Sequence, residues 1–135
     1  MAVITDSAWI VLYGNDFSPY QLSEQTGLSF EEVVEKGVTL QTTGPHQGGF
    51  APYGWARSTA FTQVEGESIE NRLLLLLSEL YDKVGNRLAD FNIESISVWL
   101  VVKHSGEGQH GFEIGPQVLL LIGQLSATLC IDYML

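Results

Sequence analysis

The fold is decided by the stretch SIENRLLLLLSELYDKVGNRLADFNIESISVWLVVK, which runs from Ser68 to Lys103. In its first part, large apolar residues recur at steps of three and four, and at about 100° per residue such positions fill one side of a helix. These positions are Ile69, Leu73, Leu76, Leu77, Leu80, Tyr81, Val84, Leu88 and Phe91. We therefore predict a helix from Ser68, the expected N-cap, to about Asp90. The second part, Ser95–Lys103, is apolar at both odd and even positions and predicts a central β-strand.

The segments before this stretch predict a strand followed by two short helices. Ala8–Tyr13 is a β-branched and aromatic run bounded by a Gly-Asn-Asp turn, which indicates a buried strand. Ser18 precedes a proline and has a glutamine three residues later, which is a helix N-cap signature, and Gly27 marks the end of that helix. Ser29–Lys36 repeats the capping signature, so we expect a second short helix there.

The remaining segments complete a sheet with helices on one face. Val38–Thr43 and Gly54–Thr62 have period-two patterns and predict strands. Pro116 begins a short helix with Leu119 on its apolar side, and Ala127–Tyr133 forms the last strand. The order β-α-(α)-β-β-α-β-α-β has no break in composition, so we predict one α+β domain over the whole chain, residues 1–135. We expect an antiparallel or mixed sheet with helices packed on one face, a ferredoxin-like variant extended by one helix and one strand.

Composition excludes several classes of protein. The 135 residues carry 16 Asp and Glu against 6 Lys and Arg, and the net charge is −10. Binders of nucleic acid or of anionic membranes need a basic stripe, so we expect neither as a partner. Cys130 is the only cysteine, and we expect it to be a buried apolar residue of the last strand. The N-terminus shows no secretory signal and the apolar runs are too short to span a bilayer, which predicts a cytoplasmic protein.

Three carboxylates lie in the expected second helix, at Glu31, Glu32 and Glu35. The two short helices have the spacing of a helix-turn-helix, but DNA phosphates would repel carboxylates on the second one. Two interpretations remain, a solvated surface or an acidic ridge that contacts a basic protein. We count the three residues as candidate partner-binding residues.

A second candidate group follows the first Gly-rich loop, Gly44–Tyr53. It consists of Phe50, Tyr53, Trp55 and Arg57, and Trp, Tyr and Arg are the usual anchors of protein interfaces. In one interpretation these residues line a peptide-binding surface or a small pocket. In the other, Trp55 belongs to the core and the rest hold the loop in place.

The second Gly-rich loop, His104–Gly115, carries His104, Glu107, His110 and Glu113 at steps of three. Two imidazoles and two carboxylates form a ligand set for a divalent ion, but no helix fixes their spacing. His104 and His110 are therefore weak metal candidates, and we expect no cofactor. The chain has neither a phosphate-binding G-x-x-x-x-G-K motif nor a G-x-S-x-G nucleophile elbow, which predicts a protein without a catalytic site.

Several short motifs are spread from about Ala8 to the C-terminus. They are the Gly14–Pro19 run GNDFSP with Leu22 and Gly27-Leu28, Glu35-Lys36-Gly37, Tyr53-Gly54-Trp55 with Ser58, the long Leu-rich helix, the Ser97–Val101 strand, Gly111-Phe112, and Ile131-Asp132-Tyr133. With these motifs the chain resembles a bacterial family known as domain of unknown function 4279. The resemblance implies a small α+β protein without an established activity or catalytic residues. Members usually carry a basic or Trp-containing stretch before the position of Lys36, where this chain has FEEVV, so we expect no function here that uses such bases.

Charge, size and the missing catalytic pattern predict a non-enzymatic binding protein with a basic protein partner. An immunity or inhibitor protein that blocks a toxin or a nucleic-acid-handling enzyme is a function of this kind, and complementary charge would make association fast and dependent on salt. Two alternatives stay open. One is small-ligand or metal binding through the two Gly-rich loops with His104, His110 and the Trp55 group, and the other is a homodimer formed by edge-strand pairing.

Overall fold

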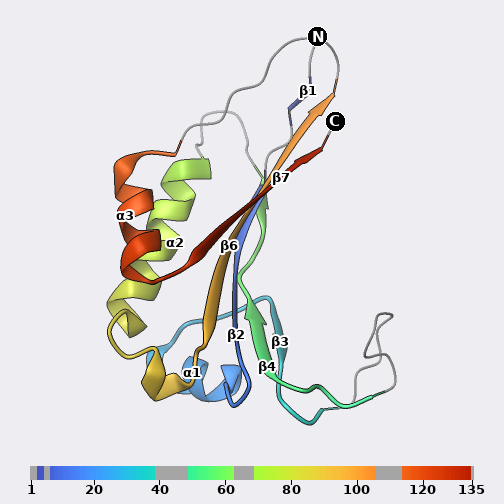
Figure 1. The fold of residues 1–135 in the computed structure, drawn as a ribbon, viewed down its shortest axis with the longest axis vertical. Helices are drawn as coiled ribbons and strands as arrows, with labels where there is room; N and C mark the ends of the chain where they lie inside the picture. Colours follow the sequence, from blue (N-terminus) through green and yellow to red (C-terminus); the bar gives the residue numbers. More distant parts are fainter. Residues whose placement is uncertain (1–2, 5–6, 39–48, 63–68, 106–113, 135) are drawn as a thin grey trace.

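A computed structural model describes residues 3–4, 7–38, 49–62, 69–105 and 114–134 (Figure 1). The strands are β1 (Val3–Ile4), β2 (Ser7–Gly14), β3 (Glu32–Val34), β4 (Gly54–Arg57), β5 (Phe61–Thr62), β6 (Ser95–Ser105) and β7 (Thr128–Met134). The helices are α1 (Pro19–Thr26), α2 (Ile69–Val84) and α3 (Pro116–Gln124), and a 3-10 turn, Ala89–Phe91, precedes β6. The chain therefore has the α+β class that its sequence predicts.

The strands form one mixed sheet around β6. β2 pairs with β6 antiparallel and β7 pairs with the same stretch of β6 in parallel, so β2 and β7 lie on opposite sides of it. β4 pairs antiparallel with both β2 and β3. The main strands follow the order β7-β6-β2-β4-β3. This is the ferredoxin-like arrangement of two interleaved βαβ units, with β7 added at one edge, and it confirms the predicted variant.

The helices lie on one side of the sheet (Figure 1), as predicted. Leu73, Leu77 and Leu80 of α2 belong to one buried apolar cluster with Ile10 of β2 and Val118 of α3. The predicted amphipathic pattern of the long helix is confirmed over α2, but the helix ends at Val84 rather than near Asp90. The chain leaves it through a turn at Gly85 and Asn86, since glycine is unfavourable inside a helix. The expected N-cap, Ser68, lies outside the described residues.

The predicted second helix, Ser29–Lys36, is wrong. Its centre is the strand β3, which pairs Val33 with Ala56 and Val34 with Trp55 of β4. The β-branched valines favour a strand, and β4 offers the backbone hydrogen bonds that a helix of eight residues would otherwise have to supply itself. Tertiary pairing therefore overrides the local capping signature.

The strand predicted over Gly54–Thr62 is interrupted. β4 and β5 both pair with β2, but the register moves by one residue between them, which defines a β-bulge at residues 58–60. There the backbone N–H of Ile10 donates to the Ser58 hydroxyl at 2.8 Å, and the Ser58 N–H donates to the Ile10 carbonyl at 2.9 Å. Val38 is not in a strand, and the rest of the strand predicted over Val38–Thr43 lies outside the described residues.

The C-terminal helix and strand occur where the sequence predicts them, with two corrections. Leu119 is exposed rather than on the buried side of α3, which is formed by Val118, Ile122 and Leu125. Cys130 is half-buried rather than buried, because β7 is the edge strand of the sheet.

Candidate functional site

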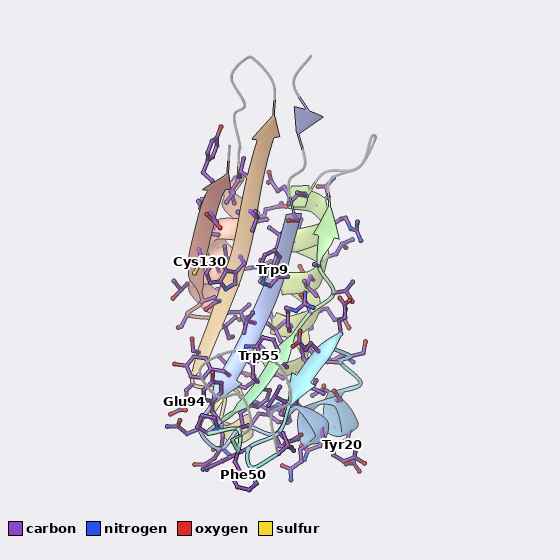
Figure 2. The ribbon with its side chains drawn as sticks, turned by 90° about the vertical axis from the view of Figure 1, so that its right-hand side faces the viewer. Trp9, Tyr20, Phe50, Trp55, Glu94 and Cys130 are labelled. Atoms are coloured by element: carbon purple, nitrogen blue, oxygen red, sulfur yellow. The ribbon has the colours of Figure 1, made fainter. Side chains whose placement is uncertain are left out.

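The sheet has a second face, which no described element covers (Figure 2). Side chains alternate between the two faces of a strand, and in β2 residues 8, 10 and 12 are buried while residues 9, 11 and 13 are not. Directly paired residues of neighbouring strands share a face, so the register extends this division across the sheet. We call the uncovered side the open face.

All three tryptophans of the chain lie on the open face. Trp9 of β2 is opposite Trp99 of β6, and their rings stack with centroids 6.3 Å apart and planes inclined by 10°. Trp55 is opposite Tyr13, whose ring meets that of Tyr53 edge-on at 5.6 Å. The register adds these residues to the same face: Val11, Glu32, Val34, Arg57, Ser97 and Cys130.

The open face also holds an ion pair. The Arg57 guanidinium lies 3.3 Å from a carboxylate oxygen of Glu32, and the two residues are directly paired across β3 and β4. The backbone N–H of Glu31 donates to the carbonyl oxygen of Arg57 at 3.0 Å, which fixes the start of β3 against β4. A partly exposed pair of this kind adds at most about 1 kcal/mol of stability, so its main consequence is a fixed orientation of the guanidinium.

The structure brings together only part of the predicted site. Trp55, Arg57 and Glu32 share the open face, and Tyr53 contacts it through Tyr13. Trp55 is half-buried, so it is not part of the buried core in which one interpretation placed it. The other three predicted residues contribute differently. Glu31 and Phe50 are exposed beside the face, and Glu35 lies at the start of α1.

Sequence reasoning missed Trp9, Trp99 and Tyr13. Both of their strands are apolar at nearly every position, and this pattern predicted burial on both faces. The signal that distinguishes the faces is residue size. In β2 the aromatic residues Trp9 and Tyr13 stand at odd positions, while smaller aliphatic residues occupy the even positions, which face the helices.

Two of the motifs that carry the family resemblance, Gly14–Pro19 and Glu35-Lys36-Gly37, meet at one corner of the fold. A Glu35 carboxylate oxygen accepts hydrogen bonds from the Ser18 hydroxyl at 3.0 Å and from the Tyr20 N–H at 2.8 Å, at the N-terminus of α1. Lys36 pairs with Asp16 at 3.0 Å. A carboxylate that accepts hydrogen bonds at the N-terminus of a helix satisfies free N–H groups and stabilises the start of the helix. Glu35 and Lys36 therefore attach α1 to the sheet, and these motif residues have a structural role.

A cavity of about 360 Å³ lies on the helix side of the sheet, beside the β-bulge. Its apolar lining includes Ile10, Leu12 and Leu80, and its polar lining includes Ser58, Arg72 and Glu79. Ligand pockets typically have volumes of roughly 300–1,000 Å³, so this cavity has the size of a site for one small molecule. It lies on the opposite side of the sheet from the open face.

Only one of the two metal candidates lies in a described element. His104 is part of β6 and pairs with Ile4 of β1, whereas His110 lies outside the described residues. Within the described ranges no three His, Cys, Asp or Glu residues gather as a metal site would require. In the same ranges no helix is long and apolar enough to cross a membrane.

Comparison with known proteins identifies the family of the chain but not its function. The model of the family described as "Domain of unknown function (DUF4279)" matches residues 4–135, so the chain belongs to this family, as the resemblance suggested. No curated protein and no solved structure matches the chain. The assignment of a function therefore depends on the geometry of the chain itself.

Proposed function

We propose that the chain is a non-enzymatic protein-binding domain that receives a basic protein on its open face. The observation that carries this proposal is the presence of all three tryptophans, together with Arg57, on the side of the sheet that no described element covers. Trp, Tyr and Arg are the residues that contribute most to binding energy at protein interfaces. A sheet face that is exposed only to solvent commonly carries polar side chains, and the aromatic residues of this face depart from that pattern.

The charge of the chain supports a basic partner. The net charge is −10, and carboxylates flank the open face on its outer strands, Glu32 on β3 and Asp132 on β7. An acidic surface attracts a basic protein and raises the rate of encounter. An immunity or inhibitor protein that blocks a basic toxin or a nucleic-acid-handling enzyme in the cytoplasm is the form of this function that we favour.

The test uses the tagged chain as bait in a lysate of its natural host. Captured protein is identified by mass spectrometry, produced separately and titrated against the purified chain. We expect a basic protein, and we expect Trp99→Ala to weaken binding by a factor of about 30 or more, which corresponds to roughly 2 kcal/mol for an interface anchor. The association rate should fall when NaCl is raised from about 50 mM to about 500 mM.

Tyr20→Ala is the matched control. Tyr20 is an exposed aromatic residue of α1, away from the open face (Figure 2), and its removal should change affinity by less than about threefold. Circular dichroism first establishes that both variants are folded. Equal binding by the two variants would contradict a site on the open face, and an association rate that ignores salt would contradict the basic partner.

A second candidate function is the binding of a small amphipathic molecule in the cavity beneath α2. The cavity of about 360 Å³ favours it, because its apolar lining is combined with Arg72 and Glu79. A medium-chain fatty acid and the alcohol of equal length serve as probes in a thermal-shift titration. We expect a saturable increase in Tm with the probe. Thr59→Trp places an indole at the lining of the cavity and should remove this increase. No shift with either probe would contradict this second function.

A further inference from the structure

Among the described strands, β7 has a partner on one side only. Thr128–Met134 pairs in parallel with Ser97–Lys103 of β6, and the described part of the chain places no strand on its other side. An open edge presents unpaired N–H and C=O groups, and proteins usually protect it with lysine, proline, a bulge or a very short strand. β7 has seven residues, TLCIDYM, without lysine, proline or glycine. The opposite edge, β3, has only three residues and carries the ion pair of Glu32.

Apolar side chains continue the core out to this edge. Leu129, Ile131 and Tyr133 are paired with Val98, Leu100 and Val102 of β6, which are buried on the helix side of the sheet. Yet Ile131 is 58% exposed and Tyr133 is 52% exposed, because no described strand lies beyond β7. On the helix side of the sheet, the apolar core therefore ends at β7 with two large side chains, Ile131 and Tyr133, that remain exposed to water.

α3 adds one more exposed apolar side chain near the same edge. α3 lies beside α2, and Leu121 packs against the core. At about 100° per residue Leu119 lies on the opposite flank of α3, away from Leu121, and this flank is directed to the β7 edge. Leu119 is 49% exposed. We call Leu119, Ile131 and Tyr133, with the backbone edge of β7, the edge patch.

We propose that the edge patch binds the edge patch of a second copy of this chain, with the two β7 strands paired antiparallel about a two-fold axis at Ile131. In this register Ile131 faces Ile131 of the other copy, and Leu129 faces Tyr133. On the open-face side of the strand Asp132 faces Cys130, so that no two carboxylates meet. An axis at Asp132 would instead oppose two like charges, which destabilises a strand pair. The pattern of β7 is therefore complementary to itself in the register centred on Ile131.

The area indicates a weak dimer. A large side chain has a surface of roughly 150–250 Å² that it can bury. Leu119, Ile131 and Tyr133 are each about half exposed, so together they can bury roughly 200–400 Å² per copy in a dimer, in addition to the backbone edge of β7. A standard stable interface buries about 800 Å² per partner. In addition, two chains of charge −10 repel each other. We therefore expect dissociation in the micromolar range, with tighter association at high salt because screening reduces the repulsion.

Sedimentation velocity from about 5 to about 500 µM protein, in low and high salt, tests the proposal. We expect a monomer–dimer equilibrium that shifts toward dimer as salt rises. Ile131→Lys should weaken it at least tenfold, because the two lysines would face each other at the axis. Val33→Lys is the matched control, since Val33 is 51% exposed on the opposite edge strand, and it should leave the equilibrium unchanged.

Cysteine cross-linking tests the register. In a Cys130→Ser background, Ile131→Cys places two thiols on directly opposed residues, whose Cα atoms are about 4.5–5.5 Å apart in an antiparallel pair and within disulfide reach. Oxidation should give a covalent dimer with Ile131→Cys and not with Leu129→Cys. A monomer at all concentrations and salts, a dimer that survives Ile131→Lys, or cross-linking through residue 129 would each overturn the proposal. Because high salt strengthens this contact and weakens binding of a basic partner, failure of one proposal is distinguishable from failure of the other.

Discussion

Replacement of Ser58 by alanine should destabilise the fold through the loss of one oxygen atom. Ser58 is 5% exposed and lies in the β-bulge where β4 loses its regular pairing with β2. Its hydroxyl accepts the backbone N–H of Ile10 at 2.8 Å, in place of the carbonyl that an uninterrupted strand would offer. In Ser58→Ala this N–H, which belongs to a central strand, loses its acceptor.

The expected cost follows from the burial of this group. A buried donor without a partner costs about 1–3 kcal/mol. Because Ser58 also lines the cavity beneath α2, water that enters the cavity can replace part of the lost bond, which places the cost at about 1–2 kcal/mol. For a chain of this length each kcal/mol lowers the Tm by roughly 3–5 °C, so we expect a fall of roughly 3–10 °C.

Denaturant unfolding followed by tryptophan fluorescence measures this cost. The midpoint should fall while the slope stays constant, because the surface exposed on unfolding does not change. Thr59→Ala is the control. It removes an exposed hydroxyl from the next residue of the bulge and should change the free energy of unfolding by less than about 0.5 kcal/mol. Equal stability of the two variants would refute the assignment of the Ser58 hydroxyl as the partner of the Ile10 N–H.

Two further pairs of substitutions test the packing by the same unfolding assay. Gly54→Ala should cost about 2 kcal/mol or more, because a Cβ atom at Gly54 would overlap the carbonyl oxygen of Phe17, whereas Gly123→Ala in α3 meets open space and should be neutral or stabilise by up to about 1 kcal/mol. Leu77→Ala should cost about 2–5 kcal/mol, because Leu77 is fully buried in α2, whereas Leu75→Ala should change stability by less than about 0.5 kcal/mol, because Leu75 is 72% exposed. Equal effects within either pair would contradict the placement of those side chains.

The features that periodicity encodes could be predicted from the sequence. Seven of the nine apolar positions predicted for the long helix lie in α2, between Ile69 and Val84, and the apolar run Ser95–Lys103 lies in β6. The ferredoxin-like order follows from the succession of elements, because short connections leave few topologies that interleave two βαβ units.

Pairing with distant parts of the chain could not be predicted in the same way. The segment Ser29–Lys36 has a local capping signature, yet it forms β3 because β4, more than twenty residues later, offers it a ladder of hydrogen bonds. The β-bulge at Ser58 is invisible in the sequence for the same reason, because it is defined by a change of register against β2. Local propensity is a weak signal wherever such a partner exists.

The candidate site was predictable only in part. The Trp55 and Arg57 pair stands out because interface-type residues follow a Gly-rich loop. Trp9 and Trp99 do not stand out in their apolar strands, and only the register shows that they stack on the same face as Trp55. The contacts of Glu35 could not be predicted either, since they depend on the position of α1.

The two proposed contacts use different parts of the sheet, and their geometry makes them compatible. An antiparallel β7–β7 pair joins two sheets edge to edge, with the two-fold axis perpendicular to the common sheet. Both open faces then lie on the same side of it, and both helix layers lie on the other. A dimer would therefore offer two tryptophan-bearing faces to a partner that is itself dimeric or repeated, and linked sites gain avidity without any new contact. Because salt moves the two equilibria in opposite directions, such avidity should be largest at an intermediate ionic strength and should disappear in Ile131→Lys.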